Sequence, residues 1–233
     1  MYSLPQKLLA EFIGTFTVVF AAAGAICADQ YLHAAGQTNA GILSYALAYG
    51  FAAAAMFSCL AHVSGAHFNP AISIGMWVSK RLGTFHALFY CVAQLLGAAG
   101  AAFVLSLIIP ESAWRPVGLG STDLAPDFTR MHGMLLEALL TFFIVFVYSW
   151  ASSGSDGGES RLGGSSIGLA IVASVFVGAA FTGASMNPAR TFGPAIAAHH
   201  WLNHGVYWVG PLFGGIIATV LYERIFLRDP STI

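Results

Sequence analysis

Long apolar segments alternate with short polar connections along the whole chain. A membrane-spanning helix needs about 20 mainly apolar residues, and six segments approach or exceed that length. The pattern predicts six transmembrane helices, at Lys7–Ala28, Gly41–His62, Thr84–Ile109, His132–Ser152, Ser165–Phe181 and Gly205–Phe226. Two connections are longer. One is the polar stretch Pro110–Met131, and the other is the Gly/Ser-rich stretch Ser153–Ser166, whose composition predicts a flexible loop.

Two further apolar stretches are too short to cross a bilayer, and each begins at an Asn-Pro-Ala triplet. An Asn side chain can cap the first turn of a helix and Pro fits the first helical position, so each triplet predicts the start of a half-helix. Paired interrupted segments in corresponding halves indicate an inverted repeat with a functional site at the bilayer midplane. The triplets are Asn69, Pro70, Ala71 and Asn187, Pro188, Ala189.

The two halves of the chain match beyond these triplets. Glu11 begins the run Glu-Phe-Ile-Gly-Thr-Phe and Glu137 the run Glu-Ala-Leu-Leu-Thr-Phe, each in the first helix of its half. Because each half has an odd number of spans, the second half enters the membrane from the opposite side. We therefore expect a single transmembrane domain over residues 1–233, with inverted repeats at approximately 1–110 and 131–233, in which the half-helices meet head to head.

Composition narrows the class of protein. The chain is 57% hydrophobic and 8% charged, against about 25% charged residues in ordinary soluble domains, so the fold class is an all-α membrane protein. A net charge of −1 argues against a nucleic-acid partner. The sequence has no nucleophile beside a base, no phosphate-binding loop and no metal-ligand spacing. It therefore predicts neither an enzyme nor a metal or cofactor site.

The distribution of Lys and Arg predicts the orientation, since these residues are enriched in cytoplasmic loops. With six alternating spans, Arg115 and Arg130 fall on one side. Six others fall on the side of the termini: Lys7, Lys80, Arg81, Arg161, Arg224 and Arg228. The bias predicts a multi-pass protein of the cell membrane with both termini in the cytoplasm.

The predicted meeting of two half-helices has a defined chemistry. Each N-terminus carries about half a positive charge, so two facing ends repel cations, including hydronium. We expect the Asn amide groups to point into the lumen as donors. The extended residues before each Asn should present their carbonyls as a ladder of acceptors: Gly65, Ala66 and His67, then Gly183, Ala184 and Ser185. Such a lining suits a file of water molecules or small hydroxylated solutes.

Arg190 lies inside the second half-helix. Arginine stays protonated in proteins and costs at least about 2.5–3.5 kcal/mol at the bilayer centre. No acidic residue lies in the same half-helix, so we interpret Arg190 as a donor and charge barrier that lines a wet pore. An ion that enters a low dielectric loses up to about 20 kcal/mol of solvation, whereas carbonyl and amide groups can replace the hydrogen bonds of a neutral water molecule.

Glu11 and Glu137 are acids deep in apolar helices and have two interpretations. They could carry protons, as in a coupled transporter, or each could accept hydrogen bonds from the backbone of a neighbouring loop. One acid per half, each associated with one loop, favours the second interpretation. His62 and His67 flank the first loop, where a brace is favoured over a pH gate.

Together these residues resemble the aquaporins of the major intrinsic protein family, over essentially the whole chain. The resemblance rests on both Asn-Pro-Ala boxes, on Arg190 three residues after the second Asn, and on Glu11, Glu137, Gln94 and the run Trp208–Pro211. It implies an aquaporin-like channel domain with six transmembrane helices and two half-helices. It also implies a homotetramer in the lipid bilayer with one pore per subunit, and passive flow of water.

The resemblance further implies a selectivity filter near the outer mouth, formed by Tyr49, Val175, Ala184 and Arg190. Typical water-selective relatives carry Phe and His at the first two positions, so Val175 predicts a wider and less polar filter. Thr191 stands where the glycerol-conducting branch has Asp, and Ala195 is typical of the water branch. Ala184 replaces a mercury-reactive cysteine of many relatives, which predicts weak inhibition by mercurials.

A passive water channel that excludes protons and ions is the favoured function. Three alternatives stay open from the sequence. The first is a broader channel for glycerol, urea, ammonia or hydrogen peroxide, which the small side chain of Val175 would admit. The second is a proton-coupled transporter that uses Glu11 or Glu137. The third is a structural junction protein with a closed pore.

Overall fold

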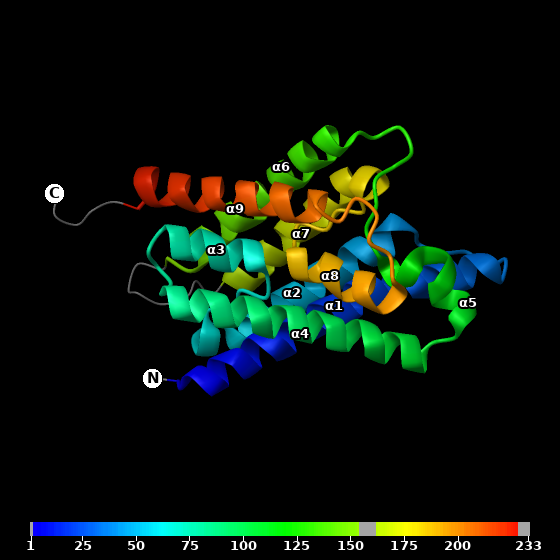
Figure 1. Cartoon of the computed structure of the whole chain (residues 1–233), viewed down its shortest axis with the longest axis horizontal. Coiled ribbons are helices and arrows are strands. Elements are labelled where there is room, and N and C mark those ends of the chain that lie inside the picture. Colours follow the sequence, from blue (N-terminus) through cyan, green and yellow to red (C-terminus); the bar gives the residue numbers. More distant parts are fainter. Residues whose placement is uncertain (1, 154–161, 228–233) are drawn as a thin grey trace.

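The computed structural model describes residues 2–153 and 162–227. Within these residues the secondary structure is entirely helical (Figure 1). The elements run in the order α1 (Leu4–Ala34), α2 (Ile42–Ser64), α3 (Pro70–Val78), α4 (Thr84–Ile108), α5 (Glu111–Trp114), the 3-10 helix η1 (Arg115–Gly120), α6 (Arg130–Ala151), α7 (Gly163–Thr182), α8 (Pro188–Ala198) and α9 (Val206–Ile225). Of these, α1, α2, α4, α6, α7 and α9 are long and apolar enough to cross a membrane. The predicted fold class is confirmed.

The ends of the spans differ from the prediction. Helix α1 has 31 residues and ends at Ala34 rather than Ala28. Its last turns are tied to the following loop, because the Asp29 carboxylate accepts hydrogen bonds from Asn39 Nδ2 at 2.9 Å and from Gly41 N at 2.7 Å. The polar stretch Pro110–Met131 contains α5 and η1, which the hydrophobic pattern did not predict.

The two half-helices, α3 and α8, begin where the triplets predict. Asn69 has an extended backbone and its side-chain oxygen accepts a hydrogen bond from Ala71 N at 2.9 Å. Asn187 caps α8 in the same way, with Ala189 N at 2.9 Å and Arg190 N at 3.3 Å. Pro occupies the first position of both helices, where its missing N–H leaves no bond unmade.

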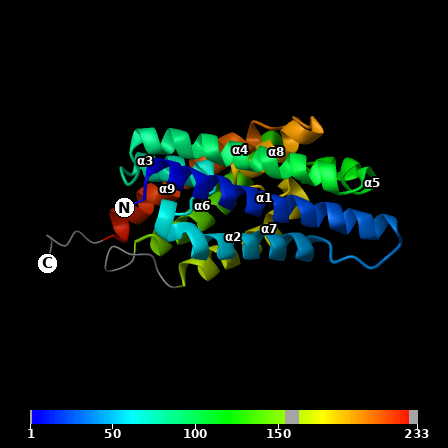
Figure 2. The same ribbon diagram turned by 90° about the horizontal axis from the view of Figure 1, so that it is seen from below.

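The long helices run along the long axis of the molecule and surround the half-helices. Helix α1 begins and α9 ends at the same end of the bundle, whereas α5 lies at the other end (Figure 1). Helix α2 packs against both α1 and α7, and the three lie side by side in Figure 2. The pair α6 and α9 shares the closest packing: a Cβ on Gly214 would lie 2.0 Å from the Ala138 carbonyl oxygen. Only glycine permits this approach of two backbones.

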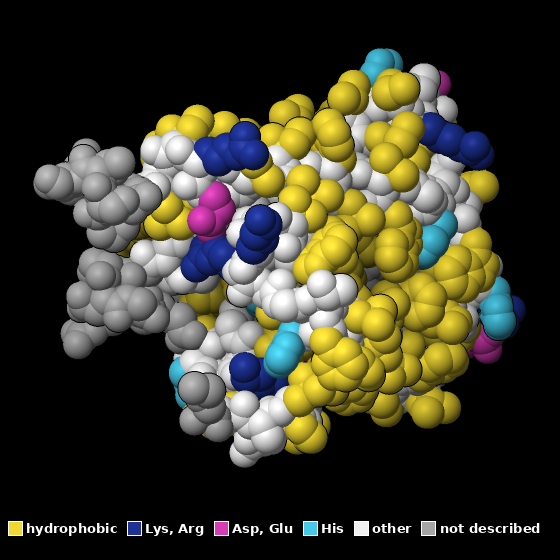
Figure 3. Space-filling model, turned by 60° about the vertical axis from the view of Figure 1, so that its left-hand side comes forward, with side chains coloured by type: hydrophobic (Ala, Val, Ile, Leu, Met, Phe, Trp, Pro, Cys, Tyr) yellow, Lys and Arg dark blue, Asp and Glu magenta, His cyan; other side chains and the backbone are white. Residues whose placement is uncertain are grey.

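The outer surface is that of a membrane protein. A broad hydrophobic surface separates two ends that carry charged side chains (Figure 3). Exposed apolar side chains on the long helices include Leu107, at 83% exposed, and Leu169, at 66%. In water so large an apolar patch would drive association, whereas in a bilayer it faces acyl chains. Two of the residues used above to predict orientation, Arg161 and Arg228, and most of the loop Ser153–Ser166 lie outside the described residues.

Candidate functional site

The two Asn caps meet at the centre of the molecule. Asn69 Nδ2 donates to the Met186 carbonyl at 2.8 Å, and Asn187 Nδ2 donates to the Phe68 carbonyl at 2.9 Å. Each amide therefore uses one N–H to bind the loop that leads into the opposite half-helix. The sequence predicts that both NH2 groups point into the lumen as donors, and these two bonds leave one N–H of each group for that role.

A short loop leads into each Asn: the first loop is residues 65–68 and the second loop is residues 183–186. The backbone is strained in the same way in both loops. Ala66 and Phe68 have φ of 53° and 52°, and Ala184 and Met186 have φ of 46° and 57°. A residue other than glycine in this left-handed region costs about 1–3 kcal/mol and persists only where its surroundings hold it. Each loop therefore needs a partner that fixes its conformation.

Glu11, in α1, is the partner of the first loop. It is fully buried and accepts hydrogen bonds from Ser64 Oγ at 2.6 Å, His67 N at 3.0 Å and Phe68 N at 2.8 Å. Gln94 Nε2 donates to the same carboxylate at 2.8 Å. Helix α1 comes close enough for these contacts because Gly14 packs on the Phe68 ring, where an added Cβ would lie 2.0 Å from a ring carbon.

Glu137, in α6, holds the second loop with an equivalent set of donors. Its buried carboxylate accepts from Thr182 Oγ1 at 2.7 Å, Ser185 N at 3.0 Å and Met186 N at 2.6 Å. The two loops and their carboxylates thus repeat one arrangement, with equivalent positions one to five residues before each Asn. Hydrogen bonds to a carboxylate are about twice as strong as neutral ones, so they can hold the strained backbone.

Four of the six loop carbonyls proposed as acceptors already receive a tyrosine hydroxyl. Tyr148 donates to Gly65 O at 2.7 Å. Tyr45 contacts both Gly183 O at 3.0 Å and Ala184 O at 2.9 Å, and Tyr49 donates to Ser185 O at 3.0 Å. A carbonyl oxygen has two lone pairs, so each keeps one acceptor site. The remaining two residues of the set, Ala66 and His67, line the central cavity described below.

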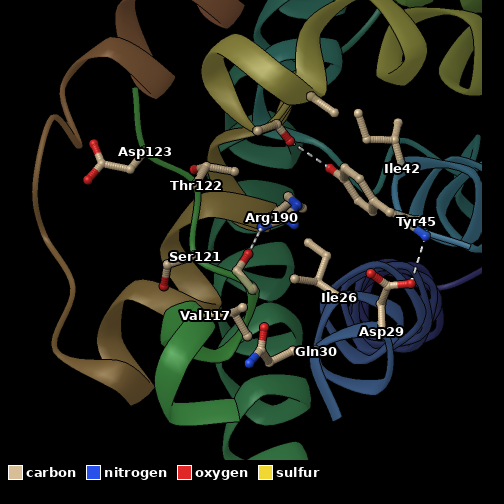
Figure 4. A pocket seen from close by; sticks show the side chains of 14 residues that line it. Ile26, Asp29, Gln30, Ile42, Tyr45, Val117, Ser121, Thr122, Asp123 and Arg190 are labelled. Atoms are coloured by element: carbon tan, nitrogen blue, oxygen red, sulfur yellow. Dashed lines mark hydrogen bonds between the residues drawn. The ribbon is translucent and has the colours of Figure 1, made fainter. Parts of the chain in front are cut away.

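Arg190 is completely buried and lines a cavity that is called the outer cavity below (Figure 4). Its Nη1 donates to the Gly120 carbonyl at 2.7 Å, and its guanidinium carbon lies 5.4 Å from the centre of the Tyr45 ring. Within the described residues, its Nε and Nη2 have no hydrogen-bond partner. Buried N–H groups of a charged side chain are costly to leave unsatisfied, so these two are suited to bind water or a polar solute.

Three cavities follow one another through the molecule. The outer one, of about 490 Å³, is lined by Tyr45, Gly183 and Arg190 among others. The central one, of about 30 Å³, is lined by Tyr49 and both Asn caps, and the inner one, of about 320 Å³, by Gly65 and Lys7. His67 and Tyr148 line both the central and the inner cavity. The central and inner cavities therefore adjoin each other, and both capping Asn residues line the central one.

Two residues predicted to belong to a filter, Val175 and Ala184, line none of the three cavities. Val175 and Ala184 are fully buried. Ile171 and Ala179, one turn before and after Val175 on α7, line the central and the outer cavity respectively. Tyr45 and Gly120 also belong to this site and were not predicted from the sequence. The spacing of Tyr45, four residues before Tyr49 on the same helix, was the available signal, because residues at i and i+4 share a helix face.

Comparison with known proteins supports the resemblance to the aquaporins. The family model named Major intrinsic protein matches residues 2–222. The probable aquaporin TIP3-2 of Arabidopsis thaliana is 40% identical over 229 residues, which cover 95% of this chain and 84% of that protein. Aquaporin-4 of Mus musculus is 38% identical over 231 residues, covering 96% of this chain and 68% of the relative.

A solved structure has the same fold. The aquaglyceroporin from Plasmodium falciparum superposes with a TM-score of 0.82 at 23% identity, covering 96% of this chain and 97% of that one. At that identity the likeness shows the fold alone. The match of the family model over nearly the whole chain, together with relatives at about 40% identity, shows that this chain belongs to the major intrinsic protein family, the channel family of the aquaporins, and is not an enzyme.

Proposed function

We propose that this protein is a passive water channel that excludes protons and other ions and is driven by osmotic gradients. The observation that carries the proposal is the meeting of the N-termini of α3 and α8, bound to each other through Asn69 Nδ2 to Met186 O and Asn187 Nδ2 to Phe68 O. Both helix ends direct positive potential towards the central cavity. The path past them offers a neutral molecule hydrogen bonds and repels a cation.

The interaction energies favour passage of water over passage of hydronium. A water molecule at the centre can accept the remaining N–H of each Asn, and one near the outer mouth can accept from Nε or Nη2 of Arg190. A hydronium about 4 Å from a guanidinium is opposed by about 4 kcal/mol at an effective dielectric constant of 20. That energy alone reduces occupancy about a thousandfold, since 1.4 kcal/mol is about tenfold, and the two helix ends add to it.

The size of the central cavity favours water over larger solutes. At about 30 Å³ it is much smaller than the outer cavity, of about 490 Å³, and the inner one, of about 320 Å³. A broader channel for glycerol, urea, ammonia or hydrogen peroxide is the second candidate, favoured by the small, apolar Val175. That the aquaglyceroporin structure has the same fold is consistent with either selectivity.

The contacts of Glu11 and Glu137 argue against proton coupling. Each carboxylate accepts at least three hydrogen bonds from donors in one loop. Protonation would turn an acceptor into a donor and break that set, so a carrier cycle would loosen the loop at every turnover. We therefore propose that both acids support the loops.

Three further features are part of the proposal. Tyr49, Val175, Ala184 and Arg190 form the filter. The protein resides in the cell membrane with both termini in the cytoplasm, which agrees with helices α1 and α9 beginning and ending at one end of the bundle (Figure 1). It assembles as a homotetramer with one pore per subunit.

Stopped-flow light scattering on proteoliposomes tests the function. We expect an impermeant osmolyte to shrink them faster than protein-free vesicles. Glycerol and urea should then give no faster re-swelling than in protein-free vesicles, and a pH gradient should leave all fluxes unchanged. Rapid re-swelling would establish the broader channel, flux that follows the pH gradient would establish the transporter, and no gain in permeability would establish a closed junction protein.

A further inference from the structure

We propose that Tyr45 is a fifth selectivity-determining residue, which closes the outer mouth together with Tyr49 and limits the size of the solute that enters. This inference rests on the proposed channel function and extends it. Tyr45 is absent from the four filter positions that the family resemblance implies. Its ring nevertheless contacts two of them, because it lies 5.4 Å from the Arg190 guanidinium carbon and stacks on the Tyr49 ring.

The geometry of Tyr45 is that of a bridge between α2 and the second loop. Its hydroxyl lies 3.0 Å from Gly183 O and 2.9 Å from Ala184 O, and the side chain is only 4% exposed. Its ring stacks on the Tyr49 ring with 6.0 Å between centroids and 24° between planes. The two phenols therefore form two layers, both anchored to carbonyls of the same loop.

The two layers separate the outer cavity from the central one. Tyr45 lines the first and Tyr49 the second, and the described residues that line these two cavities have none in common. The Arg190 guanidinium carbon lies 5.4 Å from the centre of the Tyr45 ring, and Ile26 and Ile42 also line the outer cavity (Figure 4). A solute that leaves the outer cavity thus meets Tyr45 before it reaches Tyr49.

This arrangement gives Tyr45 two effects on a permeating molecule. Its hydroxyl shares one proton between the carbonyls of Gly183 and Ala184, so water must compete for these carbonyls or bind the phenol oxygen instead. Its ring fills the space that a longer solute needs. Loss of the hydroxyl should release the ring and speed water, whereas loss of the ring should admit larger solutes.

The test uses three variants of the full-length protein in proteoliposomes. Tyr45→Phe removes the hydroxyl, and Tyr45→Ala removes the ring. Tyr207→Phe is the matched control, because the Tyr207 hydroxyl donates to the carbonyl of Thr182, the last residue of α7 before the same loop, at 2.8 Å. Tyr207 lines none of the three cavities among the described residues. Water and glycerol permeability per channel are measured for each, with thermal stability as the check on folding.

We expect Tyr45→Phe to raise water permeability about two- to tenfold, the range that corresponds to the loss of one neutral hydrogen bond. Tyr45→Ala should raise the ratio of glycerol to water permeability at least about tenfold, and Tyr207→Phe should match wild type. If wild type conducts water and both Tyr45 variants equal the control, this inference is wrong and the channel function stands. If neither wild type nor any variant gives a higher water permeability than protein-free vesicles, both this inference and the proposed channel function are wrong. Should Tyr45→Ala fail to fold, the Tyr45→Phe result decides.

Discussion

Replacement of Glu137 by Gln separates the structural from the proton-carrying interpretation of this acid. The carboxylate accepts three hydrogen bonds, from Thr182 Oγ1, Ser185 N and Met186 N. Glutamine keeps one oxygen and places an NH2 group where the other was. Because all three partners are donors in this structure, at least one backbone N–H then faces another donor beside a fully buried side chain.

The loss of stability expected for Glu137→Gln can be estimated from those hydrogen bonds. A hydrogen bond to a charged group contributes about 1.5–3 kcal/mol, and a buried N–H left unsatisfied costs about 1–3 kcal/mol. The strained φ values of Ala184 and Met186 add to the tendency of the loop to rearrange. We expect Glu137→Gln to destabilise the fold by about 3 kcal/mol, which corresponds to about 6–12 °C in the midpoint of thermal unfolding for a chain of this size.

The assay is thermal unfolding of the purified protein in detergent, together with water permeability in proteoliposomes. Glu11→Gln should lower the midpoint of thermal unfolding in the same way as Glu137→Gln. Glu111→Gln is the matched control, since Glu111 is exposed and pairs with Arg115 on the surface, where an ion pair contributes about 0–1 kcal/mol. A Glu137→Gln protein as stable as wild type, with unchanged water flux, would refute the role assigned to this carboxylate. If the Glu137→Gln protein instead lost a pH-dependent solute flux, the transporter hypothesis would replace this structural role.

Three further substitutions test the filter, each in proteoliposomes. Val175→His should lower the ratio of urea or glycerol permeability to water permeability, because imidazole adds volume and a donor between the outer and central cavities; an unchanged ratio would contradict this. Arg190→Val removes a fixed charge and two nitrogen atoms, Nε and Nη2, that have no hydrogen-bond partner, so glycerol entry and proton leak should both rise. A proton leak equal to that of wild type would show that Arg190 is not the barrier. Mercurials should leave wild type nearly unaffected and block Ala184→Cys, since the native cysteines line none of the three described cavities; strong block of wild type would contradict that placement of Cys27, Cys59 and Cys91.

Much of the site could be predicted because its signals are local. Asn before Pro caps a helix with its own side chain, so the starts of α3 and α8 follow from Asn69 and Asn187 alone. The spans follow from apolar length, and the opposed entry of the half-helices follows from an odd number of spans per half. The association of Glu11 and Glu137 with one loop each could be expected from their symmetry in the sequence.

The features that were missed depend on contacts between distant parts of the chain. The Gly120 carbonyl that binds Arg190 belongs to η1, a 3-10 segment in which Leu119 also has positive φ, 56°. No periodicity of apolar residues encodes such a turn. Likewise, an apolar helix such as α2 gives no indication which of its aromatic residues turns towards the pore, so Tyr45 emerged only from its bonds to Gly183 and Ala184.

The central claim is that two half-helices meeting at Asn69 and Asn187 pass water and turn protons away. The most direct test measures osmotic shrinkage and internal pH in the same proteoliposomes, with a pH-sensitive dye and an imposed proton gradient. The account predicts water flux well above that of protein-free vesicles and a proton flux equal to theirs. A proton flux that rises with the amount of reconstituted protein would contradict it.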